Sequence, residues 1–348
     1  MLKKKYLYIV CTAILGLIAT VAVIFFATHQ LGKKNLEKDI TIEAENAGTE
    51  IGKSTYETIM YQGQEYVYRD NIINILCMGV DKEEQMSERN DGDSSVGQAD
   101  AIFLLSMDLD KKEIRVIAVP RDTMVTLQMY NGAGTYMGER EGQITLQYAY
   151  GDGQSLSAML MAQQVSGLLN DIPINAYLAV NVRCLWKIND AIGGVDITMD
   201  DDYTEFNPLF EKGATVHLAG SNLENYIRGR DKTEVDGAYM RMHRMKQYML
   251  AFFEKAKTVV KEDMTLPLQV MEELKNDMET DVTAEKAVYL LTEALKCSFL
   301  EANMYTLSGE NYLIDGYVEY HLNEEAVMEL VLDLFYEEKQ NNPLAFWK

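Results

Sequence analysis

The stretch AIFLLSMDLDKKEIRVIAV, residues 101–119, decides the fold. Its two apolar runs are rich in Ile, Leu and Val, and a short polar turn joins them. Apolar runs of this length between polar turns indicate buried strands, and so short a connection makes the two strands antiparallel. A third run of the same kind, NIINILCMGV at residues 71–80, precedes them. The sequence therefore predicts an antiparallel sheet at the centre of the fold.

Helical and extended patterns alternate after these strands. We expect helices at residues 155–170, 182–192 and 219–227, and strands at 176–181 and 195–199. A long helix should begin after Asp236, a suitable N-cap, and end near Glu262. Residues 263–348 are predicted as helix, helix, strand and helix. The predicted fold class is α/β, with a mixed, largely antiparallel central sheet flanked by helices.

The N-terminal segment predicts the domain organisation. An apolar run from Tyr6 to Ala27 has no charge and no proline, and it follows three lysines. It is long enough to cross a bilayer as a helix, and the lysines favour a cytoplasmic N-terminus. A cleaved signal peptide is the alternative, but the run is too long and no Ala-X-Ala-like site ends it. We expect a cytoplasmic tail, a transmembrane helix, a juxtamembrane stalk, a catalytic core and a C-terminal extension, at residues 1–5, 6–28, 29–69, 70–262 and 263–348.

Charge and cysteine usage exclude some classes of protein. The formal net charge of -22 argues against nucleic acid as a partner, because a polyanion would be repelled. The four cysteines lie far apart in apolar surroundings, without a CxxC pair or metal-ligand spacing. We therefore expect buried, free thiols rather than a disulfide framework or a metal site.

Two carboxylates and an arginine should meet at one edge of the predicted sheet. Asp81 ends the first strand and Asp100 opens the second, so antiparallel pairing brings both to the same edge. The third strand returns to that edge and delivers Arg121 and Asp122. The direction of the second strand is the assumption on which this convergence depends.

A second group of cations lies in NYIRGRDKTEVDGAYMRMHRMKQY, residues 225–248. Arg228 and Arg230 are two apart, whereas Arg241 and Arg244 are three apart and would share a helix face. Guanidinium groups match phosphate and carboxylate oxygens two at a time. The alternative is a solvated face on which these arginines pair with neighbouring carboxylates. His243 lies among them, and a catalytic role is the less favoured of its interpretations.

Carboxylates and arginines at one cleft suit a diphosphate bridged by a metal ion. Mg²⁺ is typically held by one or two carboxylates together with phosphate oxygens. Phosphoryl transfer depends mainly on positioning and charge stabilisation. Neither a Walker loop nor a Rossmann glycine pattern occurs, so a soluble nucleotide is not the obvious ligand.

Seven segments in order carry a resemblance to a known family. They are INILCMGVD, QADAIFLLSMD, IRVIAVPRDT, LQYAYGDG, VNVRCLWKINDAIGGVDI, LAGSNLENYIRGR and RMHRMKQ. Together they resemble the LytR-CpsA-Psr family of Gram-positive cell-envelope proteins, over about residues 71–257. The resemblance implies an extracytoplasmic, Mg²⁺-dependent phosphotransferase anchored in the cell membrane. Such an enzyme attaches an anionic glycopolymer, teichoic acid or capsular polysaccharide, from a polyprenyl-pyrophosphate carrier to peptidoglycan.

The family's functional positions map onto this chain residue by residue. Asp81 and Asp100 resemble the metal carboxylates. Four residues resemble the catalytic, diphosphate-binding arginines: Arg121, Arg228, Arg230 and Arg241. Four more are expected to contact substrate: Arg244, Gln247, Lys82 and Asp122. Three positions depart from the family's pattern, with Glu83 in place of an arginine, Gln98 in place of another and Met245 in place of a glutamine.

Two other functions compete with the transferase. A glycopolymer or lipid-diphosphate receptor would hold its ligand without turnover, and the departures favour that reading. An envelope-associated regulator is the second alternative, although a DNA-binding role would need a basic cytoplasmic domain. Loss of polymer attachment on changing Asp81 would distinguish the transferase from a binder that works without metal.

Overall fold

The computed structural model describes residues 27–36, 57–82, 85–86, 96–131, 134–229 and 237–339. At Arg183, Arg228 and residues 237–242 it describes the backbone alone. The predicted transmembrane helix, residues 6–28, lies almost wholly outside the described residues. Within the described ranges, no helix combines the length and the apolar character needed to cross a bilayer.

A six-stranded sheet forms the centre of the molecule, in the order β11-β8-β3-β4-β5-β12. Three neighbouring pairs are antiparallel, namely β3 with β4, β4 with β5, and β8 with β11, whereas β3–β8 and β5–β12 are parallel. The mixed, largely antiparallel sheet predicted from the sequence is therefore confirmed. Its strands are β3 (Ile72–Asp81), β4 (Gln98–Asp108), β5 (Glu113–Ala118), β8 (Ala176–Asn181), β11 (Met278–Thr280) and β12 (Met304–Thr306).

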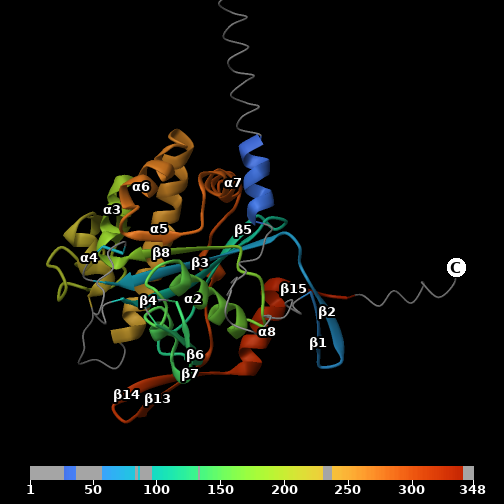
Figure 1. Ribbon diagram of the computed structural model, residues 1–348. Helices are drawn as coiled ribbons and strands as arrows, with labels where there is room; N and C mark the ends of the chain where they lie inside the picture. The colour runs from blue at the N-terminus through green and yellow to red at the C-terminus, as the bar shows by residue number, and fades with distance from the viewer. Residues whose placement is uncertain are drawn as a thin grey trace, which may run out of the picture.

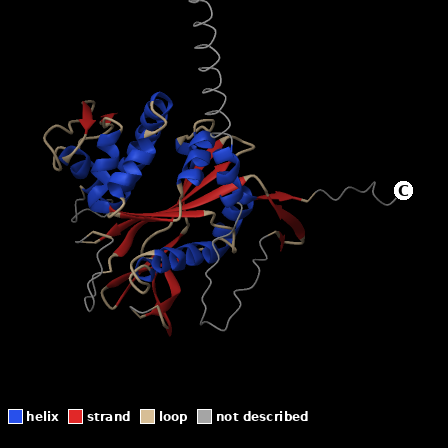
Figure 2. Cartoon of the chain, turned by 45° about the horizontal axis from the view of Figure 1, so that its top comes forward, coloured by secondary structure: helices blue, strands red, loops and turns tan. Residues whose placement is uncertain are grey.

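Helices cover both faces of this sheet (Figures 1 and 2). One side carries α5 and α7, and the other carries α2 and α8 (Figure 1). The helices are α2 (Ser155–Leu168), α3 (Leu185–Ala191), α4 (Ser221–Arg228), α5 (Gly237–Glu262), α6 (Leu266–Leu274), α7 (Ala284–Ala294) and α8 (Glu324–Phe335). Three 3₁₀ turns accompany them, at η1 (Ile144–Gln147), η2 (Val182–Cys184) and η3 (Glu301–Asn303).

Alternation along the strands explains the two layers. Successive side chains of a strand point to opposite faces. In β3, Leu76 and Met78 pack into a core shared with α2 and α8, whereas Ile73 packs into a second core on the α7 side. A third apolar cluster joins α4 and α5 to the hairpin of β9 (Val195–Thr198) and β10 (Thr215–Leu218).

Three further small sheets lie outside the six-stranded one. They are the hairpin β6 (Met124–Tyr130) with β7 (Tyr136–Gln143), the hairpin β13 (Gly309–Ile314) with β14 (Tyr317–Leu322), and the sheet of β1 (Thr58–Tyr61), β2 (Gln64–Tyr68) and β15 (Tyr336–Glu338). None of the strands β1, β2, β6 and β7 is among those predicted above, and the single strand predicted in residues 263–348 does not account for β13, β14 and β15 together with β11 and β12. Because the exposed faces of both two-stranded hairpins mix polar and apolar residues, they lack the continuous apolar run that marks a buried strand.

Two segments differ from their predicted roles. The expected stalk, 29–69, includes a helix at residues 27–36 whose Leu36 is buried and whose His29 contacts Glu293 of α7 at 3.3 Å. The expected C-terminal extension supplies β11 and β12, so both edge strands of the central sheet come from residues beyond 262. The cysteines of the described residues are free, as predicted.

Candidate functional site

Asp81 and Asp100 lie at the same edge of the central sheet, as the sequence predicted. Asp81 is the last residue of β3 and pairs with Gln98, two residues before Asp100 in β4. The register shifts by one residue between Gly79 and Val80, and this bulge leaves Asp100 without a direct partner on β3. Bulges commonly redirect a side chain next to a functional site. The one difference from expectation is that β4 begins at Gln98, so Asp100 lies inside the strand.

Arg121 lies in the turn that follows β5 and contacts the carboxylate of Asp100. Its Nη1 lies 2.7 Å from Oδ1 of Asp100, and its Nε lies 3.5 Å from Oδ1 of Asp122. Asp100 and Arg121 remain 33% and 43% exposed, so solvent and ligand can reach both groups. The convergence predicted for the third strand is therefore present, and Asp122 belongs to the same group of side chains.

Short-range hydrogen bonds hold the Arg121 turn in place. The hydroxyl of Thr123 donates to the carbonyl of Pro120 at 2.7 Å and closes the turn. Residues at the start of η1 brace it from the other side: Thr145 donates its backbone N–H to the carbonyl of Arg121 at 3.1 Å and its hydroxyl to Asp100 at 3.3 Å. Backbone and carboxylate of the site are thus fixed by one residue, Thr145.

Gln143 and Thr145 are site residues that the sequence analysis missed. The side-chain amide of Gln143 donates to Oδ1 of Asp122 at 3.1 Å and to the carbonyl of Val318 at 2.6 Å. Both residues lie just before the quoted segment LQYAYGDG. Polar residues that lie between a strand and a 3₁₀ turn can mark a functional site. The spacing of these two residues in the sequence, however, does not indicate which side chains they contact.

Lys82 does not point to the open edge. It is buried, and its ammonium group lies 3.4 Å from the carbonyl oxygen of Met86. Asn181 of β8 donates to the backbone carbonyl of Lys82 at 3.1 Å. In this position Lys82 fixes the chain after β3, and its predicted contact with substrate would require a different arrangement of its side chain.

Arg244 is also buried rather than open to a cleft. Its side chain is 1% exposed, its Nε donates to the carbonyl of Tyr226 at 2.9 Å, and its Nη2 donates to the carbonyl of Gly229. The guanidinium carbon lies 5.0 and 4.6 Å from the ring centroids of Tyr203 and Phe206. The group thus closes the C-terminal end of α4, whose last carbonyls have no partner within the helix.

Gln247 and His243 lie on α5 with Arg244 and also bond to protein groups. Gln247 accepts a hydrogen bond from the hydroxyl of Tyr226 and donates to the carbonyl of Thr198 at 3.3 Å. Nε2 of His243 contacts Oδ2 of Asp200. Burial by itself raises the pKa of Asp200, but hydrogen bonds from His243 and Tyr203 outweigh it and leave that pKa below its usual value.

The remaining arginines are only partly placed. Arg228 ends α4 and Arg241 lies in α5, but their side chains, and all of Arg230, lie outside the described part of the structure. The carboxyl end of β3, where Asp81 lies, points toward the side of the molecule that carries α4 and α5 (Figures 1 and 2). The roles predicted for Arg228, Arg230 and Arg241 therefore stay predictions.

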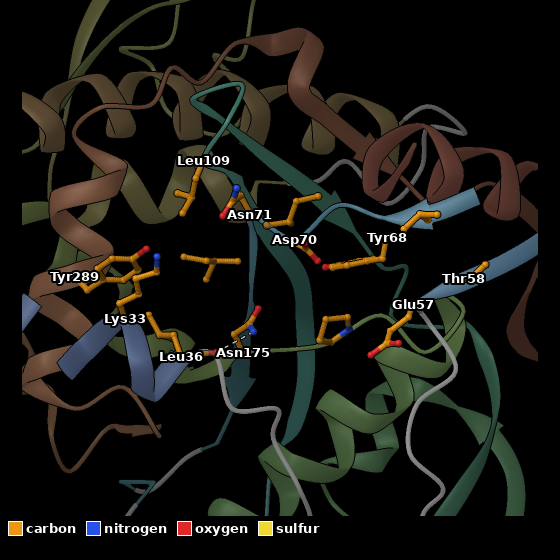
Figure 3. A pocket seen from close by; sticks show the side chains of 14 residues that line it. Lys33, Leu36, Glu57, Thr58, Tyr68, Asp70, Asn71, Leu109, Asn175 and Tyr289 are labelled. Atoms are coloured by element: carbon orange, nitrogen blue, oxygen red, sulfur yellow. Dashed lines mark hydrogen bonds between the residues drawn. The ribbon is translucent and has the colours of Figure 1, made fainter. Parts of the chain in front are cut away.

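A cavity of about 550 Å³ lies at the opposite end of β3. It is bounded by the helix at residues 27–36, the start of β3 and the loop before β8, and Lys33, Asp70, Asn175 and Tyr289 are among its lining residues (Figure 3). Asn175 donates to the carbonyl of Leu36 at 3.0 Å across its rim. None of the predicted site residues lines it, so this cavity is separate from the candidate site.

Comparison with known proteins decides the family. The model of the LytR_cpsA_psr family matches residues 35–334. The chain belongs to the LytR-CpsA-Psr family. The match continues beyond residue 262, in keeping with the position of β11 and β12 inside the central sheet.

Relatives and solved structures agree with this assignment. The chain is 24% identical over 266 residues to the polyisoprenyl-teichoic acid–peptidoglycan teichoic acid transferase TagU of Bacillus cereus strain AH820, covering 76% of this chain and 79% of that protein. A TagU of Bacillus cereus strain ATCC 14579 is 26% identical over 258 residues, or 74% of this chain and 76% of that protein. The fold matches gbs0355 from Streptococcus agalactiae with a TM-score of 0.58 at 21% identity, covering 76% and 87% of the two chains. It also matches TagT bound to LI-WTA, with a TM-score of 0.55 at 19% identity and 76% and 89% coverage.

Two of the three departures from the family pattern can be placed. Gln98 is exposed and lies opposite Asp81 in the register, so a neutral amide stands where the LytR-CpsA-Psr pattern has a cation. Met245 is half-buried beside Arg244 on α5. Glu83 lies outside the described residues. Among the side chains described at this edge, Arg121 is the cation that contacts Asp100 and Asp122.

Proposed function

We propose that the chain transfers an anionic glycopolymer of the teichoic acid class from a polyprenyl-diphosphate carrier to peptidoglycan. The observation that carries the proposal is the half-exposed ion pair of Asp100 and Arg121, with Asp81 at the same sheet edge, in a member of the LytR-CpsA-Psr family. The relatives named as teichoic acid–peptidoglycan transferases support this choice of substrates. A capsular polysaccharide is the other donor polymer compatible with this chemistry.

The donor atoms at the edge fit Mg²⁺. Asp81 and Asp100 offer carboxylate oxygens, which this hard cation prefers, and both described contacts of Asp100 fall on Oδ1, so Oδ2 is available. Among the described residues, no group of three His, Cys, Asp or Glu side chains could hold a metal ion by itself. Phosphate and water oxygens would complete the shell of an ion held by two carboxylates. When bound, Mg²⁺ would neutralise charge on the diphosphate. Asp81 and Asp100 are the residues that we propose to hold it.

The arginines act on the diphosphate itself. An acceptor hydroxyl oxygen bonds to the phosphorus on the glycopolymer side, the bridging P–O bond breaks, polyprenyl phosphate leaves, and the hydroxyl proton passes to solvent water. Arg121 orients the diphosphate through its fork and balances the charge that gathers on the departing phosphate. We assign the same task to Arg228, Arg230 and Arg241. Asp122 and Gln143 fix the position of the Arg121 turn.

Removing the carboxylate of Asp100 tests the proposed transfer reaction. We expect Asp100→Ala to lower single-turnover transfer of a lipid-linked glycan onto peptidoglycan fragments by about 10²-fold, because charge positioning at the reacting phosphate is lost. Its free energy of unfolding should change by less than about 1 kcal/mol, since the pair is solvent-exposed. Asp110→Ala, at the opposite end of the β4–β5 hairpin, is the matched control. Tight binding of lipid diphosphate without any transfer by the unmodified protein would favour the receptor alternative.

The proposed location follows from the apolar run at residues 6–28. We propose that it anchors the chain in the cell membrane of a Gram-positive-type bacterium and leaves the folded domain outside. Protease added to intact protoplasts should then digest the domain, whereas a cytoplasmic marker protein stays whole. A domain that remains intact until the membrane is opened would contradict this topology.

A further inference from the structure

The exposed apolar side chains gather on one hairpin. In the described part of the chain thirteen large apolar residues are exposed, and five of them fall within residues 312–318, which we call the hairpin tip. They are Tyr312, Leu313, Ile314, Tyr317 and Val318, and Leu313 and Tyr317 are 75% and 73% exposed. The register places Tyr312, Ile314 and Tyr317 on one face of the hairpin and Leu313 and Val318 on the other. An exposed apolar patch such as the three side chains of the first face marks an interaction site more often than an accident of packing. The hairpin tip is therefore a candidate binding surface.

The hairpin tip is built as a rigid support. Strands β13 and β14 pair without a register shift from Gly309↔Leu322 to Ile314↔Tyr317. The two-residue turn uses Asp315 and Gly316 at φ 50° and 85°, a geometry that matches the natural twist of a hairpin. A preformed surface loses little entropy on binding, and tyrosine adds a large contact area with few rotatable bonds.

Hydrogen bonds connect this hairpin to the candidate site. The N–H of Tyr320 donates to the carbonyl of Asp122 at 2.9 Å, and Thr123 forms a parallel bridge with Tyr320. The side-chain amide of Gln143 links the Asp122 carboxylate to the Val318 carbonyl. β13 and β14 lie beside β6 and β7, on the side of the molecule away from the helix at residues 27–36 (Figure 1). A ligand on the tip would therefore be held at a fixed position relative to Arg121 and Asp122.

The side chains of the hairpin tip indicate which class of ligand it can bind. One face carries Tyr312, Ile314 and Tyr317 together with Glu310 and Glu319, because these residues alternate along the paired strands. The two carboxylates accept hydrogen bonds from Tyr312 and His321, at 2.8 and 3.0 Å, and keep further acceptor capacity. Residues 309–322 contain no lysine or arginine. Aromatic rings beside carboxylates suit the C–H faces and hydroxyls of sugars, whereas anionic polymers and anionic lipids are repelled.

We propose that the hairpin tip binds the neutral glycan strand of peptidoglycan and presents an acceptor hydroxyl to the Arg121 edge. This inference rests on the proposed function, because it assigns the acceptor of that reaction to a surface. Donor and acceptor are thus separated by charge. The arginines take the anionic diphosphate, and the acidic, aromatic tip takes the uncharged polysaccharide.

Binding to sacculi tests the assignment without any turnover. Full-length protein in detergent is sedimented with purified sacculi stripped of wall polymers, and the unbound fraction is measured over a range of sacculus concentrations. We expect the double variant Tyr312→Ala/Tyr317→Ala to bind about tenfold more weakly, because two ring contacts are lost. Met137→Ala, an exposed residue on β7, is the matched control and should bind as the unmodified protein does. Equal melting temperatures establish that the variants fold.

The outcomes separate the inference from the proposed function. Affinity of the double variant for a short polyprenyl diphosphate should stay within twofold of the unmodified value, since that ligand uses the arginines. Unchanged sacculus binding by a folded double variant overturns the assignment, even if transfer itself is observed. Two other outcomes also overturn the assignment, provided that the double variant still binds sacculi. If the double variant no longer self-associates in sedimentation velocity, the hairpin tip binds a second copy of the chain. If it no longer binds phosphatidylglycerol vesicles, the hairpin tip binds a membrane. Sacculus binding through the tip without transfer upholds the inference and contradicts the enzyme.

Discussion

Arg121 and Arg244 carry the same guanidinium group in opposite surroundings. Arg121 is 43% exposed and faces carboxylates, whereas Arg244 is 1% exposed and donates to backbone carbonyls. An exposed ion pair contributes little to stability, so the structure gains little from holding Arg121 in place. Replacing a buried cation lowers stability, because the buried carbonyl groups that accepted its hydrogen bonds are left without a donor. Loss of Arg121 should therefore affect activity, and loss of Arg244 should affect folding.

Replacing Arg244 by lysine tests this contrast. Lysine keeps the charge but loses the planar fork, so it cannot serve both Tyr226 and Gly229. We expect Arg244→Lys to lower the free energy of unfolding by about 2–4 kcal/mol, measured by urea denaturation. The control is Lys255→Ala at an exposed position of the same helix, which should stay within about 0.5 kcal/mol. A change in Arg244→Lys as small as that of the control would contradict a structural role.

The contact of Asp200 with His243 predicts how stability depends on pH. The pKa of Asp200 is lower in the folded protein than in the unfolded chain, so the folded state favours the ionised carboxylate. Its contribution is present above the unfolded pKa of about 3.9 and is lost as pH falls through the lower, folded value. Both groups are more than one-third exposed, so we expect less than about 1 kcal/mol. The difference in unfolding free energy between the unmodified protein and Asp200→Asn should shrink as pH falls from 6 to 3, and a constant difference would contradict the pairing.

Among the elements, α8 is attached to the central sheet by a buried charge cluster. Oδ2 of Asp108 lies 2.9 Å from Arg69 and from Arg115, and Nη1 of Arg115 donates to the carbonyl of Leu334 at 2.8 Å. Arg115 and Asp108 are each 3% exposed. The cluster therefore connects the end of β4, the start of β5 and the last turn of α8.

Removing the charge of Asp108 should loosen this attachment. Asp108→Asn removes the carboxylate that Arg69 and Arg115 share and leaves Arg115 with Glu113 alone, at 3.3 Å. We expect it to lower the free energy of unfolding by about 2–4 kcal/mol. Asp110→Asn, two residues away and exposed, should change it by less than about 0.5 kcal/mol. Amide hydrogen exchange in α8 supplies a local readout, because protection there should fall before protection in β3 does. Equal exchange in both elements would indicate that the cluster does not hold α8 in particular.

The elements also show which parts of the fold can be predicted from sequence. Strands β3, β4 and β5 are continuous apolar runs buried on both faces, so their pattern alone indicates them, and their short or polar connections brought Asp81, Asp100 and Arg121 to one edge. β12 has three residues, too few for a strand pattern in the sequence, and it pairs with β5. The hairpin β13–β14 has an exposed face without a core pattern. Long-range contacts such as those of Gln143 and Arg244 depend on tertiary packing, which local spacing does not encode.

The net negative charge of the whole molecule repels the anionic substrate that we propose for it. The chain carries a formal net charge of -22, and an anionic glycopolymer is repelled at distances greater than the reach of the few arginines at the site. The Debye length is about 10 Å at 0.1 M salt and about 3 Å at 1 M, so added salt removes the long-range repulsion before it removes close contacts. In the proposed mechanism the diphosphate end of the donor would, in contrast, be attracted locally by Arg121, Arg228, Arg230 and Arg241 together with Mg²⁺.

We therefore predict that salt affects two donors in opposite directions. Raising ionic strength from about 0.05 to 0.3 M should increase the association rate of a lipid diphosphate that carries a polyanionic glycopolymer by about threefold or more. The same lipid diphosphate with an uncharged glycan should associate more slowly or at an unchanged rate, because only its attraction to the arginines is screened. Stopped-flow binding to the full-length protein in detergent measures both rates. Parallel decreases for the two donors would mean that the local arginines alone control the approach and that the net charge has no part in selecting how the polymer enters.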